Sequence, residues 1–108
     1  MGPAHAKEIL FTARHFDAAE ALAMGLVNRV VPSTRLEVTV AEVAESIAEN
    51  APLTLAATKV VLGEVLKDPG ERDLEACDRV VRECFESEDY VEGRRAFMEK
   101  RKPRFTGC

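Results

Sequence analysis

Four residues near the C-terminus are of types, and have a spacing, that could form a nucleotide-binding site. Tyr90, Gly93, Phe97 and Lys100 follow three- and four-residue steps, so they would lie along one line of a helix. Phe97 offers a flat aromatic face and Lys100 a cation one turn further on, and such a pair could hold an adenine ring that bears a phosphate. The alternative is structural, because aromatics at helical spacing are usually core residues and the helix dipole favours cations near a helix C-terminus.

Other chemically active side chains do not form a convincing site. His5 and His15 stand ten residues apart with no further ligands around them, which predicts no metal centre. Asp17 and Glu20 resemble a catalytic carboxylate pair, but helix capping explains their three-residue spacing better. The sequence contains no glycine-rich phosphate loop, no CxxC pair and no HExxH.

Charge is unevenly distributed along the chain. The 108 residues carry a formal net charge of −4, which argues against nucleic-acid binding by the surface as a whole. Residues 94–104 are basic, with Glu99 as their one acidic residue; the cations there are Arg94, Arg95, Lys100, Arg101, Lys102 and Arg104. This basic end predicts either a local anion site or a solvated basic tail.

The cysteines and the hydropathy pattern indicate an intracellular protein. Cys77, Cys84 and Cys108 are odd in number and lack metal-ligand spacing; Cys77 and Cys84 are seven apart, as small core residues on one helical face would be. No segment has the length and apolarity of a membrane span, and the N-terminus lacks a secretory signal pattern. We therefore expect a reducing, cytoplasmic location and no membrane contact.

The elements that would position these residues are nearly all helical. We predict a mainly α chain, residues 1–108 forming a single domain of five or six packed helices with one short extended segment at Leu26–Val31. The expected helices open at Pro3 and otherwise cover residues 18–24, 36–49, 53–66, 71–86 and 88–102. Asp17 and Ser87 are expected N-caps, and Gly25 an expected left-handed helix end.

Two of these helices predict burial against other layers. Leu36, Val40, Val43 and Ile47 form an amphipathic stripe on the helix expected at 36–49. The helix at 53–66 is apolar on several sides, which is typical of a helix sandwiched between layers. Gly63 inside it predicts the close approach of another backbone.

Several blocks of the sequence resemble the enoyl-CoA hydratase/isomerase (crotonase) family. They occur in the family's order and comprise residues 16–32, 57–59, 86–93 and 96–105. The first reads F-D-A-A-E-A-L-A-M-G-L-V-N-R-V-V-P, and the last contains F-M-E-K-R-K-P-R-F. The resemblance covers essentially the whole chain but only the C-terminal helical module of the family fold, so the N-terminal β/α catalytic core is expected to be absent.

The resemblance implies a coenzyme A contact without catalysis. In the family, two backbone N–H groups hold the thioester oxyanion and glutamates move protons, and these groups lie upstream of the matching region, so no catalytic residue is assigned here. Phe97 and Lys100 match the family positions that help hold the adenine and 3′-phosphate of coenzyme A, commonly in a neighbouring subunit's site. No tightly bound cofactor is implied; an acyl-CoA thioester would be the substrate of the parent enzyme.

Two functional hypotheses remain open from the sequence. The chain could be the oligomer-forming, coenzyme-A-contacting part of a family enzyme, with hydration of 2-enoyl-CoA in fatty-acid metabolism as the parent activity and a trimer or hexamer as the implied assembly. Alone, it is then expected to be inactive. Alternatively, it could be a free-standing, non-catalytic helical interaction module derived from that family.

Overall fold

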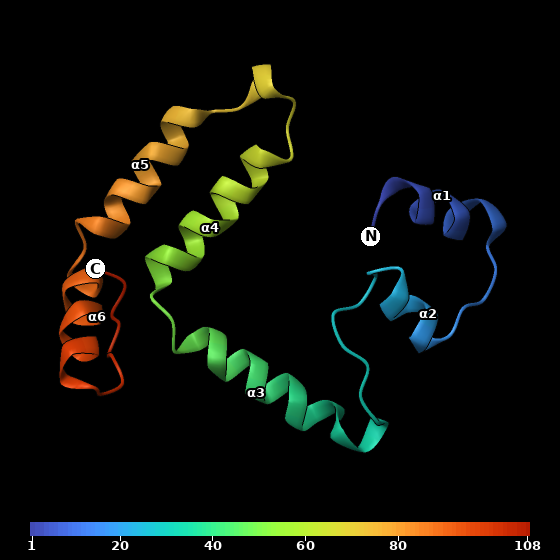
Figure 1. The fold of residues 1–108 in the computed structure, drawn as a ribbon, viewed down its shortest axis with the longest axis horizontal. Helices are drawn as coiled ribbons and strands as arrows, with labels where there is room; N and C mark the ends of the chain where they lie inside the picture. Colours follow the sequence, from blue (N-terminus) through green and yellow to red (C-terminus); the bar gives the residue numbers. More distant parts are fainter. The chain divides into compact units, whose positions relative to one another are not determined.

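The chain is mainly α, as the sequence predicted. A computed structural model describes residues 1–108 and contains six α-helices and no β-strand (Figure 1). The helices are α1 (Pro3–Thr12), α2 (Ala18–Ala23), α3 (Leu36–Ala48), α4 (Pro52–Val65), α5 (Leu74–Phe85) and α6 (Glu88–Glu99), with 3₁₀ turns at Ser33–Arg35 and Pro69–Glu71. The residues group into two compact units, Met1–Ala41 and Glu42–Cys108, and that the whole chain acts as a single domain stays a prediction.

In the first unit, local hydrogen bonds begin and end α2 as predicted. The Asp17 carboxylate accepts the Glu20 N–H at 2.8 Å, and the Glu20 carboxylate accepts the Asp17 N–H at 3.1 Å, which completes a capping box. Gly25 has a φ of 70°, in the left-handed region that glycine adopts without a Cβ clash. The segment predicted to be extended after it is non-helical and forms no β-strand.

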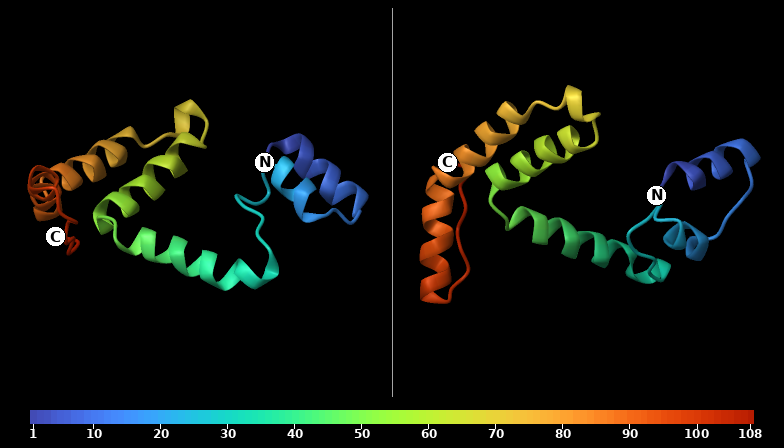
Figure 2. Two further views of the ribbon diagram at one scale, coloured as in Figure 1. Left: turned by 60° about the horizontal axis from the view of Figure 1, so that its bottom comes forward. Right: turned by 45° about the horizontal axis from the view of Figure 1, so that its top comes forward.

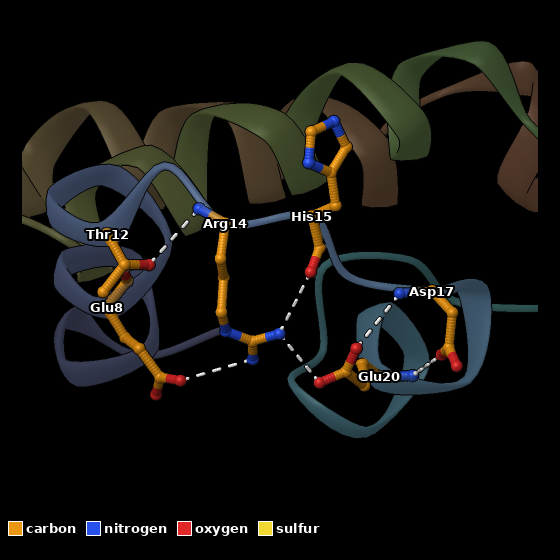
Figure 3. A network of polar contacts seen from close by, with 6 residues as sticks. All are labelled: Glu8, Thr12, Arg14, His15, Asp17 and Glu20. Carbon is orange, nitrogen blue, oxygen red and sulfur yellow. Dashed lines mark hydrogen bonds and ion pairs between the residues drawn. The ribbon is translucent and has the colours of Figure 1, made fainter.

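An arginine joins α1 to α2 in the same unit. Helix α1 ends at Thr12 and is followed by Ala13, a left-handed residue with a φ of 48°. In Figure 3 the guanidinium of Arg14 lies between the Glu8 and Glu20 side chains, with Nη1 2.9 Å from Glu20 and Nη2 3.3 Å from Glu8. The carboxylate that caps α2 therefore also holds the end of α1.

In the second unit, α4 and α5 form an antiparallel hairpin, visible in Figures 1 and 2. The Arg72 side chain closes the connection because it donates to the Val65 and Lys67 carbonyls, each at 3.1 Å, at the end of α4. Asp73 then caps α5 by accepting the Ala76 N–H at 2.8 Å. The predicted start of this helix at residue 71 was wrong, because the turn uses residues 69–73.

Few side chains are buried in either unit. The buried apolar residues are Ala21, Met24, Ala57 and Ala96. The stripe of α3 is exposed along its length, and within the second unit α4 packs mainly against α5. An ideal Cβ at Gly63 would meet nothing within 4 Å, so the close backbone approach expected from the sequence is not made by this chain itself and stays a prediction. No helix is long and apolar enough to cross a membrane.

Helix α6 begins where predicted and ends earlier than predicted. The Ser87 hydroxyl accepts the Tyr90 N–H at 3.1 Å, which confirms the cap. The helix ends at Glu99 rather than near residue 102, because Lys100 turns the backbone into the left-handed region with a φ of 54°. Residues 101–108, here called the C-terminal strap, then run back along α6 (Figure 2).

Candidate functional site

A buried carboxylate attaches the end of the strap to the start of α6. Asp89 is only 3% exposed. It accepts the Thr106 N–H at 2.7 Å and the Gly107 N–H at 2.8 Å. Because a buried carboxylate needs such donors, the sequence position of Asp89 in the first turn of α6 fixes where the strap must end.

A second carboxylate, Glu92, holds the start of the strap. Arg101 binds it with both terminal nitrogens, at 2.7 and 3.0 Å, and the Arg104 N–H donates to it at 2.9 Å. These bonds, led by that from the Arg101 guanidinium, lower the pKa of Glu92 from 4.5 to about 2. The carboxylate is therefore ionised throughout the physiological pH range and keeps its partners.

The four residues predicted to lie along one line of α6 differ in whether they pack against other residues of the chain. The Tyr90 ring makes an edge contact with Phe85, with centroids 5.1 Å apart, and the Arg94 guanidinium lies 5.9 Å from the Tyr90 centroid. Gly93 is covered by the ring of Phe105, whose nearest atom is 3.5 Å from an ideal Cβ at that glycine. Both positions thus have partners within the chain, which leaves Phe97 and Lys100 as the candidate pair.

Phe97 and Lys100 are both accessible. Phe97 is 81% exposed, so its ring is not packed into the core of this chain. Lys100 is exposed, and its N–H donates to the Phe97 carbonyl at 3.2 Å across the turn that ends the helix. The Lys100 ammonium has no hydrogen-bond or ionic partner in the chain, whereas Lys102 pairs with Glu49 at 3.0 Å and Arg101 with Glu92 and Glu99.

An apolar groove of about 720 Å³ adjoins Phe97 in the second unit. It is bounded by α4, α5 and α6 with Phe105 of the strap, and Lys100 does not line it. The residues that line it together with Phe97 include Thr58, Val61, Leu62, Arg94 and Met98. Phe97 therefore lines an apolar groove and stands three residues before a cation that has no partner in the chain.

This arrangement can bind but shows no set of reacting groups. A flat exposed ring can stack on a base, and a free ammonium can pair with a phosphate. His5 and His15 are exposed, and no group of three His, Cys, Asp or Glu side chains converges as metal ligands do. Cys77 and Cys84 are half-buried and Cys108 is exposed, all unpaired.

Reasoning from the sequence missed the residues that build the strap. Asp89 and Glu92 look like ordinary surface acids of a helix, and Asp89 in particular suits the dipole of a first turn. Their partners are nine to eighteen residues further on, and no periodic pattern links such positions. The one available signal was the pair of residues Pro103 and Gly107, which exclude a continued helix after α6.

Comparison with known proteins shows that the chain belongs to the enoyl-CoA hydratase/isomerase family, whose model matches residues 1–108. Methylmalonyl-CoA decarboxylase of Escherichia coli K12 is 42% identical over 104 residues, covering 94% of this chain and 40% of the relative. Short-chain-enoyl-CoA hydratase of Clostridium acetobutylicum is 36% identical over 102 residues, covering 94% of this chain and 39% of the relative.

Solved structures agree with this membership. A crystal structure of an enoyl-CoA hydratase/carnithine racemase from Magnetospirillum magneticum superposes with a TM-score of 0.88 at 42% identity, covering 99% of this chain and 39% of that one. For an enoyl-CoA hydratase from Bacillus anthracis the TM-score is 0.86 at 33% identity, covering 96% and 40%. The chain therefore spans about 40% of the length of the relatives it matches.

Proposed function

We propose that this chain is the C-terminal, oligomer-forming and coenzyme-A-contacting part of an enoyl-CoA hydratase/isomerase family enzyme. Phe97 stacks on the adenine and Lys100 pairs with the 3′-phosphate of an acyl-CoA substrate. The observation that carries this proposal is the exposed Phe97 ring, 81% accessible, followed by an ammonium with no partner of its own. No tightly bound cofactor is needed, since coenzyme A arrives as part of the substrate.

The relatives support the ligand more strongly than the reaction. Their names specify a decarboxylase, a hydratase and a carnitinyl-CoA dehydratase, but each acts on a thioester of coenzyme A. The shared coenzyme is what this chain's accessible ring and cation would recognise. We propose hydration of 2-enoyl-CoA, in fatty-acid metabolism, as the activity of the whole enzyme, and a reducing, cytoplasmic location, which the three unpaired cysteines suit.

Binding of nucleotides tests the contact directly. The purified 108-residue chain is titrated with coenzyme A while backbone amides are followed by NMR, which detects even millimolar affinity. Phe97→Ala and Lys100→Ala should each weaken binding by about fivefold or more, because a stacked ring and a charge-assisted hydrogen bond are lost. Phe11→Ala is the matched control, since Phe11 is equally exposed and lies in the other unit. Unchanged affinity in both test variants would remove the assignment.

Catalysis is expected to need groups outside this chain. The candidate site holds a ring and a cation but no pair of N–H donors assigned to an oxyanion, and such preorganised donors are usually the largest catalytic contribution. The chain alone should therefore not consume a 2-enoyl-CoA, followed by the loss of its conjugated absorbance. Measurable turnover would contradict the proposal that the catalytic groups lie elsewhere.

Oligomer formation is proposed from the uncovered apolar side chains. Leu62 and Val65 on α4 and the stripe of α3 remain exposed, and surfaces of this kind drive association. Gly63 lies on the same helix with open space around it, which would admit another subunit's backbone. In light scattering, the chain should associate into a trimer or hexamer, and Gly63→Leu should weaken the assembly. A monomer at high concentration would exclude this role.

The same exposed surface keeps a second hypothesis in view, a free-standing interaction module without catalysis. The two proposals differ in the size of the natural product. An antibody to the last residues, used on extracts of the source cells, should detect a product well above 11.9 kDa if the chain is part of an enzyme. A product of 11.9 kDa would favour the module.

A further inference from the structure

The turn that presents Lys100 is unusual for the residue that occupies it. Lys100 donates its N–H to the Phe97 carbonyl at 3.2 Å, and Arg101 donates to the Ala96 carbonyl at 3.0 Å, the bonding pattern of a Schellman motif. The left-handed position of that motif normally holds glycine, yet here it is a lysine with a φ of 54°. Surrounding contacts must hold a non-glycine residue in this conformation.

The contacts that hold it are centred on Arg101, the next residue. Its two terminal nitrogens bind the Glu92 carboxylate, at 2.7 and 3.0 Å, and its Nε binds Glu99 at 2.6 Å. A guanidinium bound at three nitrogens to two carboxylates of α6 has a fixed direction, which fixes the backbone just before it. The backbone just before it is Lys100.

The strap fixes the other side of the same turn. Glu92 also accepts the Arg104 N–H at 2.9 Å, and Asp89 accepts the Thr106 N–H at 2.7 Å. The chain after the turn therefore lies along α6 for its whole length. Ala96, which receives the Arg101 N–H, is 1% exposed, so the inner side of the turn is packed as well.

Arg101 is not itself free to bind an anion. Nε, Nη1 and Nη2 are all engaged by Glu99 and Glu92, and Nη1 also donates to the Lys102 carbonyl at 3.1 Å. Lys100 is the neighbouring cation without a partner. The donors of Arg101 are thus engaged within the protein, whereas those of Lys100 are free to bind a ligand.

We propose that Glu92 and Arg101 are positioning residues that hold Lys100 in its left-handed turn, where its ammonium meets the 3′-phosphate of a nucleotide stacked on Phe97. This inference rests on the proposed coenzyme A contact and adds to it. It assigns specificity for the 3′-phosphate to a pair of residues that do not touch the ligand.

The test compares two probes on the 108-residue chain by NMR titration: adenosine 3′,5′-bisphosphate, and AMP, which lacks the 3′-phosphate. Arg101→Gln and Glu92→Gln should each weaken bisphosphate binding by about fivefold, while AMP binding changes by less than about twofold. Glu92→Gln is the sharper variant. Loss of a negative charge would by Coulomb's law tighten anion binding, so weaker binding points to positioning.

A double variant separates positioning from a general structural effect. If Arg101 acts through Lys100, then Arg101→Gln should have no further effect on bisphosphate affinity once Lys100→Ala is present. Arg14→Gln is the matched control, because Arg14 also follows a left-handed residue and also binds two glutamates, in the other unit. It should leave both affinities unchanged.

The outcomes distinguish this inference from the proposed function. Bisphosphate binding that Lys100→Ala weakens and Glu92→Gln leaves equal or tighter would overturn the positioning role alone. Additive effects in the double variant would do the same. Wild-type chain that binds neither probe, or that does not prefer the bisphosphate, would overturn the coenzyme A contact and the positioning role together.

Discussion

The two units of this chain share one local arrangement at a helix end. Each has a helix that ends in a non-glycine left-handed residue, Ala13 after α1 and Lys100 after α6. In each, the next residue is an arginine bound to two glutamates. Hydrogen bonds to those glutamates, led by Glu20 and by Glu92 respectively, raise the pKa of Arg14 and of Arg101.

The geometry of the two arginines differs. Arg14 makes one bond to each of its glutamates, at 2.9 and 3.3 Å, and thereby joins two helices (Figure 3). Arg101 binds Glu92 with two parallel bonds, and the same carboxylate also holds the strap. Both Glu20 and Glu92 also accept a backbone N–H, so the difference lies in the pairing itself: two parallel bonds fix the direction of the Arg101 guanidinium more tightly than single bonds fix that of Arg14.

The largest expected difference in stability between the two units comes from removing the carboxylate that holds the strap. Asp89→Ala removes a buried acceptor from the Thr106 and Gly107 N–H groups and should lower the free energy of unfolding by about 3 kcal/mol. Asp17→Ala, the corresponding loss of a capping carboxylate in the first unit, should cost about 1 kcal/mol because its partners can reach water. Urea unfolding measures both. Equal losses would mean that the strap adds nothing beyond an ordinary cap.

A smaller effect tests whether the two left-handed residues are equally strained. Ala13→Gly and Lys100→Gly should each relieve about 1–2 kcal/mol of left-handed strain. The larger entropy of unfolded glycine offsets about 0.5–1 kcal/mol of that, so each variant should gain about 0.5–1 kcal/mol in thermal unfolding. A loss of stability in Lys100→Gly, with a gain in Ala13→Gly, would show that the lysine side chain itself stabilises the turn.

The last prediction concerns the titration of the Glu92 carboxylate, which does not change the stability of the chain near neutral pH. Its pKa is about 2 in the folded chain against an ordinary 4.5. The stabilising contribution is therefore fully present above the ordinary value and is lost as the pH falls through the folded value. A ¹³C NMR titration should find the Glu92 midpoint near 2, and Arg101→Gln should raise it. A midpoint near 4.5 in the unaltered chain would show that the ion pair between Arg101 and Glu92 does not form in solution.

What the sequence determined by itself are the features made by near neighbours. Asp17 and Glu20 are three residues apart, so the capping box follows from local geometry, and Gly25 marks the helix end for the same reason. The six helices and the family resemblance also depend on short patterns. Spacing and residue types left Phe97 and Lys100 open between a nucleotide site and ordinary packing, and the family resemblance made them the candidate pair.

What only the tertiary structure decided are the features made by distant partners. Arg101, just after the end of α6, pairs with Glu92 nine residues back, and Asp89 accepts the N–H of Thr106 seventeen residues further on. The same strap places Phe105 over Gly93 and so uses one predicted site position for packing. Propensity and periodicity describe contacts within about one helical turn, so pairings of this range are decided by packing and charge in the folded chain.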